Sequence, residues 1–534
     1  MKTIQSSEFD AYWKSQSVQE ADLQAEAAVR EVVEAIKKEG DKAVRHFASR
    51  FDKSSPEQLE VPMAEVERAY AQLQAKEPAL ARALELAAEH IARFSLKQKE
   101  QFAHFEFEMG KGVWTGQRVI PVERAMVYAP GGRFPLISSL LMALLPALSA
   151  GVEEVFLASP PMEDGLPDWR ILAAAAIAAK LAGVPAGRLR FFAVGGAQAV
   201  AAFALGTQSI PRADVIAGPG NKYVATAKRL LYGQVGIDFI AGPSDILVVA
   251  DGSAPAELAA VDMIAQAEHD PDARARALVP NPKFADEIAA AIEKRLETLP
   301  TAATARASLE NGGLIVVYSN KEEAIRIANA LAPEHLELQT ADDEAWVPHL
   351  KNYGSLFIGA LAAEVLGDYS AGINHTLPTS TSARFTGGLS VRHFLKTVTT
   401  LRCAPGKAFE KVRHAAETLA HAEGLAGHAL SAQLRENFSI PPPTPGGFME
   451  ILVRAPTEDE AAHMKSKPIW TCEVSEFDWH YDSEEVCLIL EGEVTVRHGA
   501  TSVRIAAGDY VVFPAGLSCV WNVTKPIKKH YIFR

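Results

Sequence analysis

The chain has 534 residues, which is too long for one hydrophobic core and predicts several domains. Hydrophobic residues make up 48% and charged residues 22%, as in a folded globular protein rather than a disordered one. The formal net charge of −13 and the lack of a dense basic run argue against nucleic-acid binding. The chain has 4 cysteines, too few for a disulfide framework, and its start, "MKTIQSSEFDAYWK", lacks the apolar core of a signal peptide. We therefore expect a cytoplasmic protein.

The first hundred or so residues are rich in Ala, Glu and Lys, and "ADLQAEAAVREVVEAIKKEGDKAVRHFASRFD" has helical periodicity. Gly40 stands where a helix C-cap is expected. Further on, "FPLISSLLMALLPALSAGV" (Phe134–Val152) is apolar over about the length of a bilayer crossing. Because it contains Pro135, Pro146 and several serines, we expect a helix buried inside an α/β domain and no membrane span.

From about Val119, short apolar runs alternate with alanine-rich helical segments, as in "RAMVYAP", "EEVFLASPP", "RILAAAAIAAKLAGV", "RLRFFAVGG" and "DILVVAD". This alternation predicts parallel sheets with helices on both faces. The loops "PGGRFP", "VGGAQA" and "AGPGNKY" follow strands directly, where open α/β sheets bind their ligands. None of them is a GxGxxG fingerprint, so alone they do not indicate a dinucleotide.

The composition changes again at "SIPPPTPGG", residues 439–447, which predicts an extended proline-rich linker. After it, "VCLILEGEVTVRHGATSVRIAAGDYVVFPAGLSCVWNV" has glycine turns between alternating runs, which is typical of an antiparallel sandwich or barrel. The expected organisation is an α/β region over 1–438, the linker over 439–447 and a β-domain over 448–534.

Acidic and imidazole side chains gather in four segments of the α/β region. In "DMIAQAEHDPDAR", Gln266 and His269 are three residues apart and share a helix face, while Glu268 points elsewhere. This fragment is either half of a metal site or a polar helix end. The other three segments pair such residues as follows: Glu334 with His335, Asp368 with His375, and Glu423 with His428. Imidazole and carboxylate ligands suit zinc, whereas a glutamine oxygen is an unusual and neutral ligand.

Several of these motifs, in this order, resemble the histidinol dehydrogenase family, whose zinc- and NAD-dependent enzymes complete histidine biosynthesis. The matching motifs are "AGPSDILVVAD", "APEHLEL", "GDYSAGINHTLPT" and "HAEGLAGHA". The motifs "PGGRFP", "VGGAQAVAAFA" and "AGPGNKYVATAKR" match its nucleotide-binding half, about residues 119–240. The resemblance extends to about residue 437 and implies two incomplete Rossmann-like parallel-sheet domains with helical N- and C-terminal extensions.

Carried over position by position, the resemblance assigns a role to twelve residues. The implied zinc ligands are Gln266, His269, Asp368 and His428. The implied acid–base pair is Glu334 and His335, and the NAD contacts are Tyr128, Gln198 and Asn221. The implied substrate contacts are Ser244, His375 and Glu423, together with the zinc ligands and His335. The family forms a domain-swapped homodimer, so His428 is expected in the partner's site, and Glu268 is expected to be structural.

The implied reaction is the four-electron oxidation of L-histidinol to L-histidine through L-histidinal. His335, with an ordinary pKa of about 6.5, is the expected base, and Glu334 is expected to activate the water that hydrates the aldehyde. One departure is Arg133 and Phe134, where the biosynthetic enzyme has smaller residues. Similar loops occur in relatives that oxidise other alcohols, such as sulfonated diols, so that substrate is an alternative. A zinc hydrolase and a non-catalytic binding protein are the remaining alternatives.

The C-terminal region, residues 448–534, resembles a cupin of the ureidoglycine aminohydrolase-like type. The matching stretches are "WTCEVSEFDWHYDSEEVCLILEGEVTV" and "AAGDYVVFPAGLSCVWNVTKPIKKHY". A metal-binding cupin has an H-x-H pair, a glutamate and a later histidine, and these positions are Trp479, Tyr481, Glu485 and Cys519 here. We therefore expect a metal-free or altered cupin with a small apolar pocket, which senses a ligand or assists assembly. A catalytic pair of Glu485 and Cys519 is an alternative, and His480 and His530 are expected to be exposed or structural.

Overall fold

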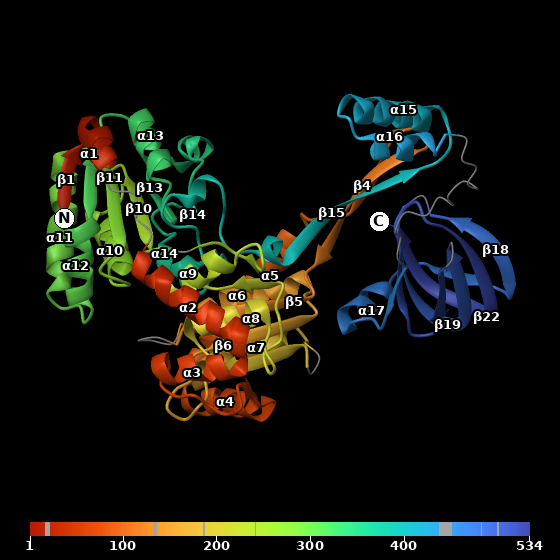
Figure 1. Ribbon diagram of the computed structural model, residues 1–534, viewed down its shortest axis with the longest axis horizontal. Coiled ribbons are helices and arrows are strands. Elements are labelled where there is room, and N and C mark those ends of the chain that lie inside the picture. Colours follow the sequence, from red (N-terminus) through yellow and green to blue (C-terminus); the bar gives the residue numbers. More distant parts are fainter. Residues whose placement is uncertain are drawn as a thin grey trace. The chain divides into compact units, whose positions relative to one another are not determined.

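The computed structural model describes residues 1–15, 22–131, 136–184, 187–240, 242–436, 451–481, 483–498 and 501–533. The chain forms two compact units (Figure 1). The first unit comprises Met1–Ala103 and Val119–Thr397, and the second comprises His104–Arg118 and Val398–Arg534. Arg133, Phe134 and the predicted linker over 439–447 lie outside the described residues.

The first unit begins with a short strand and five helices, as the composition of this region predicts. They are β1 (Lys2–Gln5), α1 (Phe9–Ser15), α2 (Leu23–Glu39), α3 (Asp41–Phe51), α4 (Met63–Lys76) and α5 (Pro78–Lys99). Asp22 caps the N-terminus of α2, where its side chain accepts a hydrogen bond from the backbone N–H of Ala25 at 2.9 Å. Gly40 ends α2 with a φ of 57°, which confirms it as the C-cap.

The first sheet has the strand order β2-β7-β6-β5-β8-β9 and is parallel except at its edge strand β2. Its strands are β2 (Glu60–Val61), β5 (Arg124–Tyr128), β6 (Glu154–Ser159), β7 (Leu189–Ala193), β8 (Val215–Ala217) and β9 (Gly236–Ile237). Alternate strand residues enter two cores: Val127 packs with α4 to α7, and Met126 packs with α2, α3, α8 and α9. These helices are α6 (Ile137–Ala150), α7 (Trp169–Leu181), α8 (Gly196–Leu205) and α9 (Lys222–Leu231).

The second sheet is parallel throughout, with the order β1-β12-β11-β10-β13-β14. Its further strands are β10 (Asp245–Ala250), β11 (Arg274–Val279), β12 (Leu314–Val317), β13 (His335–Gln339) and β14 (Ser355–Ile358). The connecting helices are α10 (Ala256–Ala267), α11 (Pro282–Leu296), α12 (Ala302–Gly312), α13 (Lys321–Leu331) and α14 (Glu364–Tyr369). Two layered parallel sheets are therefore confirmed (Figure 1).

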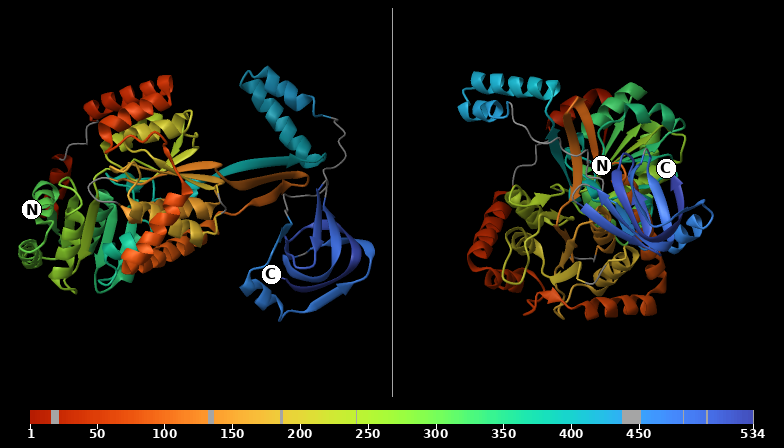
Figure 2. Two further views of the ribbon diagram at one scale, coloured as in Figure 1. Left: turned by 90° about the horizontal axis from the view of Figure 1, so that it is seen from below. Right: turned by 90° about the vertical axis from the view of Figure 1, so that its right-hand side faces the viewer.

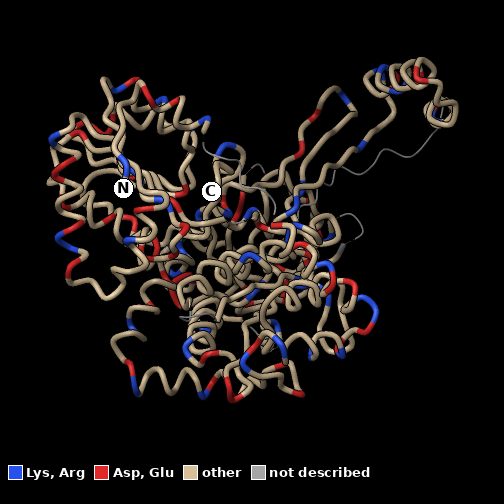
Figure 3. The backbone as a smooth tube through the Cα atoms, turned by 60° about the vertical axis from the view of Figure 1, so that its left-hand side comes forward, with Lys and Arg blue, Asp and Glu red and all other residues tan. Residues whose placement is uncertain are grey.

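Helix α6 is the apolar segment that approaches the length of a membrane span. Eleven of its residues are buried, including Pro146, and it packs between α5 and α7. None of the helices in the described part of the chain is long and apolar enough to cross a membrane. Around the sheets, Lys and Arg are interspersed with Asp and Glu along the outer helices of the first unit (Figure 3).

A three-stranded sheet that the sequence analysis did not predict belongs mostly to the second unit. Its strands are β3 (Phe105–Gly110), β4 (Val113–Pro121) and β15 (Leu395–Cys403), in the order β15-β4-β3. Two helices follow, α15 (Lys407–Ala422) and α16 (Ala426–Gln433), as the predicted helical C-terminal extension. Local periodicity does not reveal the pairing of β15 with β4, because the two strands are far apart in the chain. The hairpin of β3 and β4 does have a local signal, the alternation of Phe105, Phe107 and Met109.

The C-terminal part of the second unit is antiparallel, which confirms the predicted β-domain. Its strands are β16 (Leu452–Arg454), β17 (Ile469–Cys472), β18 (Ser475–His480), β19 (Glu485–His498), β20 (Thr501–Ala506), β21 (Tyr510–Phe513) and β22 (Ser518–Phe533). They follow the order β16-β21-β19-β22-β17, with β18 on β22 and β20 on β19, and curl around a shared core (Figure 2). Helix α17 (Glu458–Met464), with Thr457 as its cap, was not predicted.

Candidate active site

The catalytic candidates of the first unit lie where β10 and β13 begin. Ser244 directly precedes β10 and Glu334 directly precedes β13, and these strands are neighbours with Ile246 paired to His335. Helix α10 follows β10 and runs back along the sheet, so its C-terminal end, which carries Gln266, returns to the same amino edge. Residues from three distant segments therefore meet at one edge of the second sheet.

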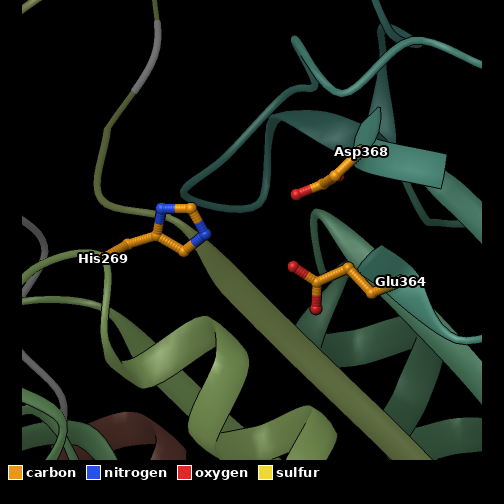
Figure 4. A group of neighbouring side chains, drawn as sticks. All are labelled: His269, Glu364 and Asp368. Atoms are coloured by element: carbon orange, nitrogen blue, oxygen red, sulfur yellow. The ribbon is translucent and has the colours of Figure 1, made fainter. Parts of the chain in front are cut away.

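The end of α10 contributes the histidine of a possible metal site. The helix ends at Ala267, and His269 lies just beyond it, with its backbone N–H 3.4 Å from the Gln266 carbonyl oxygen. The His269 ring is directed toward the carboxylates of Glu364 and Asp368 (Figure 4). Each of these three residues offers a ligand atom within 4.8 Å of the others. The structure thus brings two predicted ligands, His269 and Asp368, together with a third group, Glu364, that the sequence analysis missed.

Gln266 contacts this cluster through Glu364. Its side chain is buried, and with the amide nitrogen facing α14 it donates a hydrogen bond to Glu364 Oε2 at 3.0 Å. Glu364 and Asp368 are four residues apart on α14, a spacing that places both carboxylates on one helix face. That spacing in "AAEVLGDYS" is the signal that could have identified Glu364 from the sequence.

His335 lies next to the cluster of His269, Glu364 and Asp368 and is almost fully buried. Its Nε2 atom is 3.3 Å from Asp368 Oδ1, and its Nδ1 atom is 3.9 Å from a carboxylate oxygen of Glu334 and of Glu364. Burial by itself would lower the pKa of His335, but the surrounding carboxylates outweigh it and raise the pKa above its usual range. The arrangement keeps a proton-binding group in direct contact with the Asp368 carboxylate.

Glu334 is held by a reciprocal pair of hydrogen bonds to Asp245. Its Oε2 accepts from the Asp245 backbone N–H at 3.0 Å, and its own N–H donates to Asp245 Oδ1 at 2.5 Å. Burial raises the pKa of Glu334 to about 8, against the lowering effect of the neighbouring His335. Glu334 can therefore hold a proton near neutral pH, next to the imidazole of His335.

His375 has both ring nitrogens occupied. Nδ1 is 2.8 Å from the Asp368 carbonyl oxygen, which can only accept, so Nδ1 carries a proton and donates. Nε2 is 2.9 Å from the hydroxyl oxygen of Ser139, on the first turn of α6. Burial lowers the pKa of His375, so the neutral ring accepts from Ser139. These contacts connect the loop after α14 to the helix that follows β5.

The predicted NAD contacts lie at the carboxyl edge of the first sheet. The chain passes from β5 to β6 and β7 on one side and to β8 on the other, so a topological switch point lies between β5 and β8. Tyr128 ends β5, and its hydroxyl oxygen accepts from the Gly196 N–H at 3.0 Å, at the start of α8. Asn221 caps α9, where its side chain accepts from the N–H groups of Tyr223 and Val224. Such crevices, with helix N-termini beside them, are where α/β sheets bind nucleotide phosphates.

Gly218 allows two segments at this edge of the sheet to lie close together. Its φ is 114°, and a Cβ there would collide with the carbonyl oxygen of Tyr128. The loop after β8 therefore passes close to the end of β5 only because residue 218 has no side chain.

Asp52 is a polar group beside Gln198 that the sequence analysis did not single out. Its Oδ2 accepts from the amide of Gln198 at 3.1 Å and from the Gly195 N–H at 3.3 Å. Burial raises the pKa of Asp52 to about 6, against the lowering effect of these two hydrogen bonds. Gln198, a predicted NAD contact, is thus oriented by a carboxylate from the end of α3.

The two remaining predicted residues belong to the second unit. Glu423 is the C-cap of α15 and His428 lies in α16, and both are exposed. The site described above therefore consists of residues of the first unit alone.

Comparisons with known proteins identify the family of the chain. The family model described as histidinol dehydrogenase matches residues 14–436. The chain belongs to the histidinol dehydrogenase family. A histidinol dehydrogenase of Pseudomonas syringae pv. tomato is 42% identical over 410 residues, covering 76% of this chain and 88% of that protein. One from Thermus thermophilus is 45% identical over 415 residues, covering 78% of this chain and 95% of that protein.

A solved structure supports the same family and its fold. The crystal structure of histidinol dehydrogenase from Elizabethkingia anophelis has a TM-score of 0.74 and 34% sequence identity, covering 82% of this chain and 98% of that one. The chain is therefore an enzyme of this oxidoreductase family. The family model described as an EutQ-like cupin domain matches residues 459–531, which confirms the predicted C-terminal cupin.

The residues of the cluster fit the zinc ion that the family implies. Both ring nitrogens of His335 and Asp368 Oδ1 are buried and, among the described residues, lack a hydrogen bond of good geometry. Buried polar atoms without partners are rare and indicate a missing ligand or ion. One imidazole, from His269, and two carboxylates are a suitable donor set for zinc.

Proposed function

We propose that the chain oxidises L-histidinol to L-histidine with zinc and NAD. The observation that carries this proposal is the convergence of His269, Glu364 and Asp368 beside the buried His335. In this assignment Gln266, His269, Asp368 and His428 hold zinc, and Glu364 either replaces or orients Gln266. The bound metal would supply a template that positions the imidazole and amine of the substrate.

In the proposed mechanism the chain's own residues move the protons of two successive oxidations. His335 takes the hydroxyl proton of the alcohol when its ring is in the neutral form, and the short distance to Asp368 stabilises the imidazolium that forms. Glu334 takes a proton from the water that adds to L-histidinal, and His335 returns its proton to the aldehyde oxygen as the hydrate forms. The neutral His335 then takes a proton from the hydrate in the second oxidation. Ser244 and His375 orient the substrate, with His375 held as a neutral ring by Ser139. NAD, bound at Tyr128, Gln198 and Asn221, would supply the hydride acceptor in both steps.

The proposed enzyme is a domain-swapped homodimer in which Glu423 and His428 enter the partner's site. Exposed apolar side chains of the second unit support it, because such patches mark interfaces. On β3, Phe105, Phe107 and Met109 alternate along the strand and are 51%, 53% and 64% exposed. Helices α15 and α16 add the exposed side chains of Val412, Leu419 and Leu430, and the exposed Leu434 follows α16 directly.

The catalytic proposal is tested by NADH formation from L-histidinol and NAD⁺, followed by absorbance, with two NADH expected per substrate. A zinc hydrolase gives none, and a panel with L-histidinal and sulfonated diols distinguishes the alternative substrate. His335→Asn should keep zinc and lose activity, whereas His269→Asn should lose both, as measured by metal analysis. The exposed His349→Asn is the matched control and should change neither. Full zinc content in the His269 variant would contradict the ligand set.

The shared site is tested by mixing two inactive variants, His269→Asn and His428→Asn. If His428 acts in the partner's site, each mixed dimer has one site with both histidines intact, and activity returns on subunit exchange. If both histidines act within one chain, the mixture stays inactive. Phe107→Asp should yield monomers in sedimentation experiments, whereas Leu361→Asp, at a position 93% exposed in the first unit, should leave the dimer intact.

The same proposal assigns the chain to the cytoplasm and its dehydrogenase region to residues 1–438, separated from the cupin over 448–534. Residues 119–240 form the nucleotide-binding half in this division. Limited proteolysis that releases an intact fragment ending near the linker, with full dehydrogenase activity, would support these boundaries.

A further inference from the structure

The cupin contains a cavity of about 160 Å³ with an unusual lining. Seven aromatic side chains surround one carboxylate and one ammonium group, Glu485 and Lys529. The aromatic residues are Trp470, Phe477, Trp479, Tyr481, Trp521, Tyr531 and Phe533. Ligand cavities are mostly apolar and carry a few polar groups that orient the ligand, which is the composition seen here.

The cavity has a buried floor and an accessible mouth. Tyr481, Glu485, Trp521 and Lys529 are all nearly inaccessible to solvent, whereas Trp479 and Phe533 are 44% and 50% exposed. Alternate residues of β22 point to the same face, so Trp521, Lys529, Tyr531 and Phe533 all line the interior. Side chains at the mouth can therefore move aside for a ligand without disturbing the floor.

Lys529 occupies the place of a cation at the floor. Its ammonium group forms an ion pair with Glu485 and lies over the rings of Trp521 at 4.6 Å and Trp470 at 4.8 Å. Glu485 is the glutamate of the cupin metal pattern, but its charge is already balanced by this tethered ammonium. Trp479 and Tyr481 offer no metal-binding nitrogen, and Tyr481 accepts a hydrogen bond from the Trp521 ring N–H at 3.2 Å. The cavity therefore does not fit a metal ion.

The same charge balance defines the chemistry of the ligand. Because Glu485 and Lys529 neutralise each other, neither a free cation nor a free anion would gain an uncompensated partner. An ammonium group has three donors and a carboxylate about four acceptor sites, so their mutual contact leaves capacity in both. A neutral molecule with a donor beside an acceptor can bind both at once. Aromatic walls favour a flat ring, and a cavity of about 150 Å³ is known to hold benzene, so one ring fits.

We propose that the cupin cavity binds a small, neutral, planar nitrogen heterocycle of the lactam type. The ring N–H donates to Glu485, the adjacent carbonyl oxygen accepts from Lys529, and the faces of the ring contact the tryptophan side chains. This site lies wholly within the cupin and does not depend on the dehydrogenase reaction.

The test is calorimetric titration of the full-length protein with 2-pyridone, which carries an N–H beside a carbonyl. N-Methyl-2-pyridone lacks the donor and toluene lacks both groups, so each should bind at least tenfold more weakly, because a buried polar group would be left unpaired. Equal affinity for the three compounds, or no heat from 2-pyridone, would overturn the proposal.

Variants assign the binding to the cavity. Lys529→Met and Glu485→Gln should each weaken 2-pyridone binding by tenfold or more. In case either disturbs folding, Trp479→Ala and Phe533→Ala at the mouth provide the same test without altering the floor. Val474→Ala is the matched control, since this residue is 61% exposed on the same domain and does not line the cavity. His269→Asn should bind 2-pyridone as the unmodified protein does, and any loss in that variant or in Val474→Ala would place the ligand elsewhere.

Discussion

Glu364 provides the most informative test of the metal cluster, through the variant Glu364→Gln in metal-free protein. Burial raises the pKa of this carboxyl from 4.5 to about 8, although the nearby His335 acts to lower it. The folded state then binds a proton more tightly than the unfolded state between these two values. Stability from this group is therefore fully present below about pH 4.5 and is lost as pH rises toward 8.

The size of the effect follows from the same two pKa values. Each pKa unit corresponds to about 1.4 kcal/mol. The ionisation of Glu364 therefore lowers the free energy of unfolding by about 2 kcal/mol at pH ~6 and by about 4 kcal/mol at pH ~8. Glutamine has nearly the same shape and no charge to bury. The variant should therefore have a higher free energy of unfolding than the unmodified protein. This difference should be about 2 kcal/mol larger at pH ~8 than at pH ~6.

The assay is urea unfolding of the chelator-treated protein at both pH values, with Glu322→Gln, an exposed glutamate on α13, as control. Zinc should then stabilise the unmodified protein by mass action but stabilise Glu364→Gln much less, because a ligand or its orienting group is lost. A stability gain that does not change with pH would refute the electrostatic reasoning. Equal stabilisation of both proteins by zinc would show that Glu364 neither binds zinc nor orients a zinc ligand.

Three further predictions concern the substrate and nucleotide sites. Ser139→Ala frees Nε2 of His375 and should raise KM for histidinol by about tenfold with little change in kcat, and an unchanged KM would exclude this positioning role. Gly218→Ala should lower the free energy of unfolding by ~2–4 kcal/mol and abolish NAD⁺ binding, since its Cβ would collide with Tyr128; urea unfolding and fluorescence titration measure both effects. Asp52 has a pKa of about 6, so it is neutral below that pH and charged above it. The charged carboxylate should repel the NAD pyrophosphate, so Asp52→Asn should strengthen NAD⁺ binding at pH ~8 but not at pH ~5. The same gain in affinity at both pH values would contradict this repulsion.

The local sequence predicted the ends of several elements and the type of each sheet. The α2 C-cap at Gly40, the alternation that gives parallel sheets and the glycine turns of the cupin all depend on neighbours a few residues away. The pairing of β15 with β4 was missed because it joins distant segments, whereas the hairpin of β3 and β4 was missed although Phe105, Phe107 and Met109 alternate along β3. Predicted ligands His269 and Asp368 do meet, whereas the position of His428 in the complete site stays a prediction.

By itself the sequence determined which chemical groups are available and which short-range structures carry them, because backbone propensity and side-chain spacing act over a few residues. Only the tertiary structure decided which charges face each other. Glu364 joins His269 at the end of α10, Asp52 orients Gln198, and Lys529 on β22 neutralises Glu485 on the neighbouring strand β19. Each of these pairings depends on burial and distance between segments far apart in the chain, and those two quantities set the pKa and the ligand chemistry of each site.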